Sequence, residues 1–237
     1  MRILRYITSL IFLFLGWNVI AQETEKDFKP SEIIFAADVV GLGKTAFSDE
    51  TKLEFHSKID FHYYYLAADF GVDKINPIGD DFDYSSEGTF FRVGPHINLM
   101  PYNKHRSSIF FGLMYAQSTF SDKINYSQED VGWGADQITY ANDDMKARWF
   151  EANLGINVQI AGPLYLGYTL RFKFAKDLSS YGELMPYEIP GFGKADKNGQ
   201  FGFNYYVIYK LRFRDKPIPK RPVKIEEKPQ SSGNPSR

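Results

Sequence analysis

Histidine and carboxylate side chains are the first groups in this sequence that could do chemistry. The chain has four histidines. His56 alternates with Glu54, Lys58 and Asp60, so all four side chains would share one face of a strand. Such a cluster could hold a metal ion, but no ligand spacing of the His-Glu-x-x-His kind is present. We interpret these groups as the polar filling of a charged interior and expect neither a metal site nor a cofactor.

Serine residues lie close to two of the histidines and raise the alternative of a lipid acyl hydrolase or transferase. That chemistry needs Ser, His and an acid together. Ser57 follows His56, but neighbouring strand residues point to opposite faces and cannot pair directly. Ser107 and Ser108 lie near His105 in a short connection, away from the rim at which such enzymes act on the outer leaflet. We therefore expect no catalytic residue.

A Gly-x-Gly-Lys segment invites comparison with a phosphate-binding loop. The segment lacks the full Gly-x-x-x-x-Gly-Lys-Ser/Thr spacing, and Ala195 stands where a hydroxyl is needed. Its Pro-Gly pair instead predicts a turn with positive φ at the glycine, in a folded loop packed on the mouth of a barrel. The loop motif comprises Pro190, Gly191, Phe192, Gly193 and Lys194.

The acidic segment 119–144 is a second candidate contact surface. It is expected to be an ordinary solvated loop, with calcium binding as the alternative. Its aromatic and acidic residues are Tyr126, Asp130, Trp133, Asp136, Tyr140, Asp143 and Asp144.

Strands would hold these groups in place, and a hydrophobic period of two residues indicates such strands through most of the chain. In 201–213 every odd position is apolar or aromatic, and the positions between are mostly small or polar. Alternation of this length predicts a strand with different surroundings on its two faces. Strands are predicted at 52–61, 90–99, 150–160, 164–174 and 201–213, and weaker ones at 33–42, 64–73 and 107–118, about eight in all.

These strands predict an all-β, antiparallel, up-and-down transmembrane β-barrel with a polar interior and an apolar exterior. The apolar faces of 150–160, 164–174 and 201–213 carry no charge and are long enough to cross a membrane. Aromatic residues at presumed strand ends suit the membrane interface, namely Tyr63, Tyr64, Tyr65, Trp149 and Phe213. A soluble lipocalin-like barrel, with the faces reversed, is the alternative.

Charged residues share the polar parity of these strands and are expected to pair inside the barrel. About eight strands leave an interior that side chains just fill, which disfavours a channel. The predicted interior charge network comprises Glu54, Lys58, Asp60, Asp69, Arg92, Glu151, Arg171, Lys173, Lys210 and Arg212.

Connection lengths alternate along the predicted barrel. Short connections fall near 62–63, 100–106 and 161–163, and long ones near 43–51, 74–89, 119–144 and 176–199. Short turns at one rim and long loops at the other are typical of outer-membrane barrels. An even number of strands then places both termini on the short-turn side, the periplasm.

Charge and cysteine content narrow the possible partners and compartments. The chain of 237 residues has 28 Lys and Arg against 29 Asp and Glu, which gives no electrostatic footprint for nucleic acid. There is no cysteine, and thus no disulfide, thiol chemistry or Cys-bound zinc.

The two ends of the chain differ in composition from the predicted barrel. Residues 1–21 have basic Arg2 and Arg5, a short apolar core, and small or aliphatic Val19 and Ala21, so they predict a cleaved signal peptide. Residues 22–32 form an N-terminal lead and 33–213 the outer-membrane barrel. Residues 214–237 are rich in proline and lysine, and we expect a disordered periplasmic tail.

Three segments together resemble a family of uncharacterised outer-membrane β-barrel proteins from Bacteroidota-type bacteria. They are the leader ending in Ala21-Gln22, the loop 185–194 and the strand segment 203–209. The resemblance covers about residues 28–213 and implies an outer-membrane location. The final strand is also similar to the terminal signal read by the barrel assembly machinery, through Val207, Tyr209, Leu211 and Phe213.

The sequence therefore predicts a non-enzymatic outer-membrane barrel with a structural or interaction role, possibly as a subunit of an outer-membrane assembly. Its expected partners are outer-membrane lipid and, during biogenesis, the barrel assembly machinery; nucleic acid is not expected. The lipid-modifying enzyme and the lipocalin-like binding barrel stay as alternatives.

Overall fold

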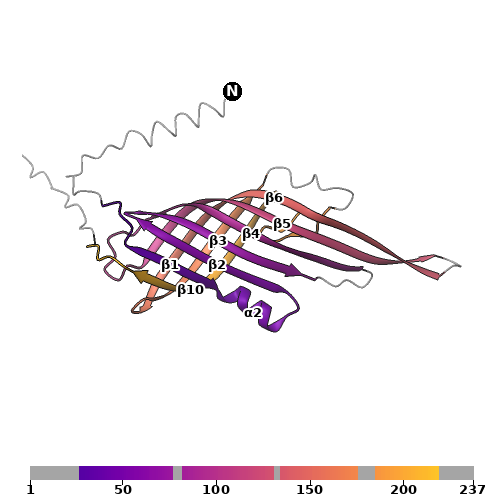
Figure 1. Ribbon diagram of the computed structural model, residues 1–237, viewed down its shortest axis with the longest axis horizontal. Helices are drawn as coiled ribbons and strands as arrows, with labels where there is room; N and C mark the ends of the chain where they lie inside the picture. Colours follow the sequence, from indigo (N-terminus) through magenta and orange to yellow (C-terminus); the bar gives the residue numbers. More distant parts are fainter. Residues whose placement is uncertain (1–26, 77–81, 131–133, 176–184, 219–237) are drawn as a thin grey trace, which may run out of the picture. The chain divides into compact units, whose positions relative to one another are not determined.

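Eight antiparallel strands close into a barrel, in the order of the chain (Figure 1). The computed structural model describes residues 27–76, 82–130, 134–175 and 185–218. The predicted all-β antiparallel architecture is confirmed, and the ring closes where β1 pairs with β10. The barrel strands are β1 (Glu32–Asp38), β2 (Thr51–Phe61), β3 (Tyr64–Ile75), β4 (Phe82–Asn98), β5 (Ser108–Asp130), β6 (Gly134–Ala161), β7 (Leu164–Phe174) and β10 (Gly199–Arg212).

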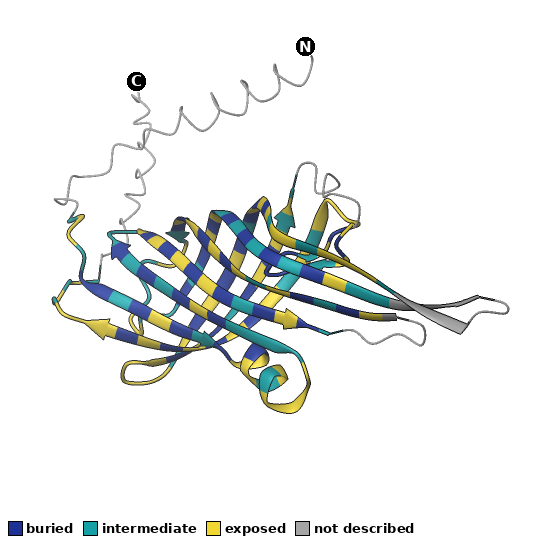
Figure 2. Cartoon of the chain, turned by 45° about the vertical axis from the view of Figure 1, so that its right-hand side comes forward, coloured by how far each residue is buried: buried dark blue, intermediate teal, exposed yellow. Residues whose placement is uncertain are grey.

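Burial alternates along the strands with the predicted period of two (Figure 2). On β10, Asn204, Tyr206 and Ile208 are buried while Tyr205 and Val207 are exposed. The same alternation on β6 and β7 leaves the apolar parity outside and the polar parity inside. The barrel interior thus holds charged and polar side chains, and its outer surface is apolar.

Two of the expected interface aromatics instead face the interior. Trp149 and Tyr65 are buried, at 1% and 8% exposure. Each has the parity opposite to its outward neighbours, since Phe150 on β6 and Tyr64 on β3 are exposed. Parity therefore outweighed the preference of aromatic rings for strand ends, and the expectation for these two residues was wrong.

The segment predicted as a strand at 33–42 ends earlier, at Asp38. A nine-residue helix, α2 (Val39–Phe47), follows it. The Asp38 carboxylate accepts hydrogen bonds from the backbone N–H groups of Val40 and Gly41 at 3.3 and 3.2 Å, which caps the helix and ends the strand. No helix in the described part of the chain is long and apolar enough to cross a membrane.

Two of the long loops expected from the sequence are largely strand. Within 119–144, β5 runs to Asp130 and β6 begins at Gly134, which forms a hairpin that extends beyond the rest of the sheet (Figure 1). Similarly, β4 begins at Phe82, inside the expected loop 74–89. The hairpin was missed because its side chains lack an apolar stripe. Polar cross-strand contacts hold it instead, such as Thr139 Oγ1 donating to Asn125 Oδ1 at 2.8 Å.

Short turns lie at the opposite rim, together with the two ends of the described chain. His62 between β2 and β3 and Gly162 between β6 and β7 have positive φ, 62° and 51°. The Arg214 guanidinium forms an ion pair with Asp27, which joins the residues after β10 to those before β1. Residues 1–26 and 219–237, which include the predicted signal peptide and most of the predicted tail, lie outside the described residues.

Candidate functional site: the charged lumen, its plug and its rims

Two arginines bind three carboxylates in the centre of the lumen. Arg171 Nη2 lies 2.8 Å from Asp69 Oδ2 and 3.0 Å from Glu54 Oε1, and its Nη1 lies 3.0 Å from Glu151 Oε2. Arg92 Nε lies 2.9 Å from Glu151 Oε1, and its Nη1 lies 2.9 Å from Glu54 Oε1. All five side chains are buried. Buried charges of this kind need opposite charges close by, and the two guanidinium groups supply them.

Two aromatic residues complete this cluster and were not among the residues predicted for it. The Tyr206 hydroxyl accepts from Arg171 Nη2 and donates to Glu54 Oε1, both at 2.7 Å. Trp149 Nε1 donates to Glu151 Oε1 at 2.8 Å. Parity was the signal that could have found them, because both residues have the inward parity of their strands.

Two predicted network lysines do not pair with the central carboxylates. Lys173 Nζ donates to the backbone carbonyls of Gly191 and Phe192 at 2.8 and 3.2 Å. Lys58 Nζ lies 3.3 Å from the centroid of the Phe110 ring, a cation–π contact. Both side chains point inward, but β2 and β7 present them at levels where a carbonyl or a ring is the nearest partner.

Three basic side chains surround the Glu32 carboxylate at the short-turn rim. Lys210 Nζ lies 3.7 Å and Arg212 Nε 3.9 Å from this carboxylate, and Arg106 Nη1 lies 4.0 Å away. The expected pairing of Lys210 and Arg212 with the central acids was therefore wrong. Glu32 was missed because the barrel was expected to begin at residue 33, whereas Glu32 is the first residue of β1.

Asp60 also belongs to this rim rather than to the central cluster. Its carboxylate accepts from the backbone N–H groups of Ser31 and Glu32 at 2.6 and 2.7 Å and from Ser31 Oγ at 2.8 Å. Its ion-pair partner is Lys216, at 3.5 Å, after the last strand. The acid thus fastens both ends of the described chain to β2.

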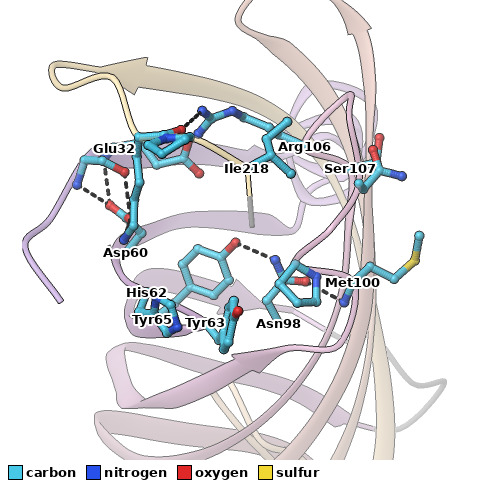
Figure 3. A pocket seen from close by; sticks show the side chains of 15 residues that line it. Glu32, Asp60, His62, Tyr63, Tyr65, Asn98, Met100, Arg106, Ser107 and Ile218 are labelled. Atoms are coloured by element: carbon cyan, nitrogen blue, oxygen red, sulfur yellow. Dashed lines mark hydrogen bonds and ion pairs between the residues drawn. The ribbon is translucent and has the colours of Figure 1, made fainter. Parts of the chain in front are cut away.

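A small cavity of about 70 Å³ lies at this rim (Figure 3). Asn98 Nδ2 donates to the Tyr65 hydroxyl at 3.2 Å on one side of it. Lys216 and Ile218 line it from the C-terminal side, and Arg106 Nη2 donates to the Lys216 carbonyl at 2.6 Å. Residues 214–218 of the predicted tail thus have defined contacts at this rim.

An ion pair between Arg214 and Asp27 joins the two ends of the described chain outside the strands. We call this contact the clasp. The guanidinium also donates to the carbonyls of Lys29 and Pro30. The hydrogen bond from Arg214 lowers the pKa of the Asp27 carboxyl from 3.8 to about 2. The same bond raises the pKa of the Arg214 guanidinium.

The predicted loop motif folds as a plug in the other mouth of the lumen. Its hairpin pairs β8 (Glu188–Ile189) with β9 (Gly193–Lys194). Phe192 and Ile189 are buried, and the Phe192 ring makes an edge contact with Trp149 at 5.5 Å between centroids. The motif therefore inserts into the mouth instead of resting on it.

Gly191 anchors this plug through both of its backbone polar groups. Its carbonyl accepts from Arg92 Nη2 at 3.1 Å and from Lys173 Nζ at 2.8 Å, and its N–H donates to Asp73 Oδ2 at 2.8 Å. Its φ is 76°, and a Cβ there would lie 2.4 Å from the Phe90 ring. Only glycine suits this turn, whose polar groups bind the barrel rather than a phosphate. Within the rest of the motif, Pro190 is buried, Gly193 has a φ of 113°, and exposed Lys194 lies 5.5 Å from the Tyr187 ring.

The histidines do not assemble a metal site. His56 Nδ1 is hydrogen-bonded to Asp69 Oδ1, and His96 stacks on Phe110 at 5.0 Å between centroids. The His62 ring contacts the Tyr63 ring in a tilted arrangement in the first short turn. In the described ranges no three His, Asp or Glu side chains are grouped as metal ligands. Of the acids considered for calcium, Asp143 and Asp144 are exposed on β6, and the side chains of Asp130 and Asp136 lie outside the described part, as does Trp133.

The chain matches a known protein family over most of its length. The model of a domain of unknown function, DUF6048, matches residues 3–216. The chain belongs to this family. The match includes all eight barrel strands, the plug and the rim contact of Lys216. No curated protein matches the chain.

The serines considered for catalysis have structural partners. Ser57 Oγ donates to the Ala68 carbonyl at 3.1 Å on the outer face. Ser108 Oγ accepts from Asn157 Nδ2, and Ser107 Oγ accepts from the backbone N–H of Gln159, both at 3.2 Å. These hydrogen bonds link neighbouring segments of the sheet. Each of the three hydroxyl groups is thus bonded to a backbone or amide group.

The residues of the proposed assembly signal share the outer face at the end of β10. Phe213 lies just after the strand, where its N–H donates to the Ser31 carbonyl at 3.1 Å. The side chains are exposed by 45–55%, namely Val207, Tyr209, Leu211 and Phe213.

Proposed function

We propose that this protein is a non-conducting outer-membrane barrel with a structural or interaction role. The apolar outer face supports the membrane location. On β6 the outward residues run from Phe150 to Ile160. A strand of that length measures about 33 Å and, at a tilt of about 40°, spans about 25 Å, the height of the apolar band in outer-membrane barrels. A lipocalin-like barrel would bury this face and expose the charged one.

The single observation that carries the non-conducting role is the filled lumen. The Arg92–Arg171 cluster occupies the centre. The plug around Gly191 and Phe192 fills part of one mouth, beside a cavity of about 290 Å³ that Glu54 and Arg92 line. A pore would need a continuous path of water past both. A lipid-modifying enzyme would need a Ser–His–acid group at a rim, and the described contacts of Ser57, Ser107 and Ser108 do not favour it.

The interaction role rests on the hairpin of β5 and β6. Its cross-strand ladder continues to Asp130↔Gly134, whereas the pairing of β6 with β7 ends at Phe150↔Phe174. Since the short turns are proposed to face the periplasm, this hairpin projects outward from the cell surface. During biogenesis, the barrel assembly machinery would engage β10 from Val207 to Phe213.

Site-specific photo-crosslinking in native cells tests the interaction role. A photoreactive residue at Lys123, exposed on the hairpin, is expected to yield discrete protein adducts. The matched position Leu154, exposed on the barrel wall, is expected to yield lipid adducts only. If neither Lys123 nor its cross-strand partner Ala141 gives protein adducts, an interaction through the hairpin is contradicted.

Membrane separation on a density gradient tests the location. We expect the protein in the outer-membrane fraction, with a folded form that migrates faster than the heated form on gels. Recovery in the soluble fraction would favour the lipocalin-like alternative.

A further inference from the structure

The barrel wall has a gap between β2 and β10, beyond the end of β1, that none of the described strands fills. The pairing of β1 with β2 stops at Ala37↔Phe55, and its pairing with β10 stops at Asp38↔Tyr206. The strands on either side continue, with β2 starting at Thr51 and β10 at Gly199. Helix α2 lies beside this part of the wall (Figure 1).

The inner side of α2 takes over the hydrogen bonds that a strand would have made with β2. Lys52 N–H donates to Thr45 Oγ1 at 2.8 Å, and Thr45 Oγ1 lies 3.3 Å from the Lys52 carbonyl. Gly41 lets the helix approach, because a Cβ there would lie 2.5 Å from the same carbonyl. The Thr45 side chain thus satisfies the backbone groups of Lys52 on the open edge of β2.

One backbone donor on the edge of β10 and one inward side chain are satisfied by Asp38, the residue before α2. Tyr205 N–H donates to Asp38 Oδ1 at 3.3 Å, and Asn204 Nδ2 donates to Asp38 Oδ2 at 3.1 Å. Asp38 therefore both caps α2 and ties it to the second side of the gap. The helix is a part of the wall rather than a loose loop.

The outer side of α2 is apolar. The residues at positions i, i+3, i+4, i+7 and i+8 of the helix form one face. Among them Val39 and Leu42 are exposed by 45% and 44%, and Phe47 by 93%. The charged Lys44 lies off this face and forms an ion pair with Glu50 at 3.6 Å. This face also contains the small residues Gly43 and Ala46, and we call it the outer face of α2.

The outer face of α2 continues the apolar surface of its neighbours. Phe55 on β2 is exposed by 57%, and Phe203 on β10 by 59%. A water-exposed helix would interrupt this surface, whereas an apolar helix face extends it across the gap. Because the outer face of α2 is continuous with the apolar strand surfaces on both sides, the partner that covers it is lipid.

We infer that α2 is a membrane-embedded segment of the barrel wall and that Val39, Leu42 and Phe47 contact lipid. The inference rests on the proposed membrane location. It adds that the wall at the gap between β2 and β10 is closed by a helix lying along the membrane interface, not by a strand.

Spin-label accessibility tests this inference, and the absence of cysteine makes single labels straightforward. The full chain would carry Leu42→Cys, Lys44→Cys or Leu154→Cys, each labelled and reconstituted into phosphatidylcholine vesicles. Collisions with oxygen report lipid, and collisions with a water-soluble nickel chelate report water. We expect the oxygen-to-nickel ratio at position 42 to exceed that at position 44 several-fold, while position 154, deeper in the apolar band, gives the highest ratio.

The possible outcomes separate the two proposals. A lipid signature at 154 with a water signature at 42 would overturn the inference about α2 and leave the membrane location intact. Water signatures at both positions would overturn the membrane location, and the inference with it. Low accessibility to both reagents at 42, with spin–spin broadening between chains, would show that a second copy covers α2 and would overturn the lipid contact. The gel-mobility shift of each variant verifies that the barrel is folded.

Discussion

Arg171 and Asp69 form an ion pair across the full width of the barrel. Their Nη2 and Oδ2 atoms are 2.8 Å apart although 102 positions separate the residues in the chain. Arg171 lies on β7 and Asp69 on β3; β10, β1 and β2 separate these strands on one side, and β6, β5 and β4 on the other. Two side chains from opposite walls therefore meet in the middle, which requires a lumen only one layer of side chains wide.

Removal of one central carboxylate should destabilise the barrel strongly. Glu151→Ala deprives both Arg92 and Arg171 of a partner. A buried charge that loses its partner costs about 3–5 kcal/mol. Urea unfolding in detergent, followed by the gel-mobility shift, measures the change in the free energy of unfolding.

Glu87→Ala is the matched control for this variant. Glu87 is also paired, with Lys74 at 3.3 Å, but its side chain is 66% exposed. An exposed pair contributes about 0–1 kcal/mol. Equal unfolding midpoints for the two variants would contradict a stabilising role for the central cluster.

An arginine on the outer face should prevent insertion only within the apolar band. Leu154 on β6 is 49% exposed, and Leu154→Arg at the bilayer midplane should cost about 2–4 kcal/mol. Tyr140→Arg, on the same strand about 45 Å away along the hairpin, should insert normally. The yield of the heat-modifiable form in lipid vesicles measures the difference.

Asn153 is no suitable control for Leu154, because it is buried and lies opposite Arg171 in the strand register. Asn153→Arg would place two guanidinium groups side by side in the lumen. If Leu154→Arg and Tyr140→Arg insert with equal yield, the outer face at position 154 does not contact lipid.

The clasp between the chain ends should weaken in acid, when Arg214 loses the Asp27 carboxylate and keeps only the carbonyls of Lys29 and Pro30. The pKa of Asp27 is about 2 in the folded protein against an ordinary 3.8. A lowered pKa means that the carboxylate stabilises the clasp above about pH 4, and that this contribution is lost as the pH falls through 2. Spin labels at Lys29→Cys and Asp215→Cys should show strong dipolar broadening at pH 7 that decreases near pH 2.

Asp27→Asn provides the control for the titration. Its labels should be separated already at pH 7 and change little on acidification. Labels at Lys123→Cys and Ala141→Cys, which are cross-strand partners on the hairpin, report whether the barrel itself survives. Broadening that is independent of pH in the parent protein would exclude Asp27 as the titrating group.

The plug should leave the lumen when its turn can no longer form. A side chain at Gly191 would clash with the Phe90 ring and strain a φ of 76°. In a protein carrying Ala195→Cys, buried at 2% exposure, Gly191→Val should therefore speed labelling by a maleimide at least several-fold. Gly43→Val, where a Cβ would meet nothing within 4 Å, is the control. Equal labelling rates in all three proteins would contradict a plug held by this turn.

The parity of the strands was predictable from the sequence, and the partners within the lumen were not. Alternation alone indicated that Arg171 and Lys173 share the inner face of β7. Their different partners depend on strand register and tilt, which bring Arg171 level with Asp69 on the opposite wall and Lys173 level with the carbonyl of Gly191. Neither quantity is encoded in a period of two.

Local polar contacts explain the remaining differences between prediction and structure. Asp38 ends β1 by capping α2, a role that the surrounding apolar residues masked in the sequence. The hairpin beyond Phe120 is stabilised by polar cross-strand pairs, so hydrophobic periodicity could not reveal it. Gly191 was identified as a turn residue, but its insertion depends on Arg92 and Asp73, which lie far away in the chain.

The parent protein should not conduct ions. An ion that crosses the lumen would have to pass the level where Arg171 joins Asp69, Glu54 and Glu151. Opening that level exposes several buried charges without partners, each at a cost of several kcal/mol. Purified protein in planar bilayers should therefore give no stable ohmic conductance, with the gel-mobility shift of the same preparation as proof of folding. A large and steady conductance would mean that the lumen is open, and the protein would then be a channel rather than a closed barrel.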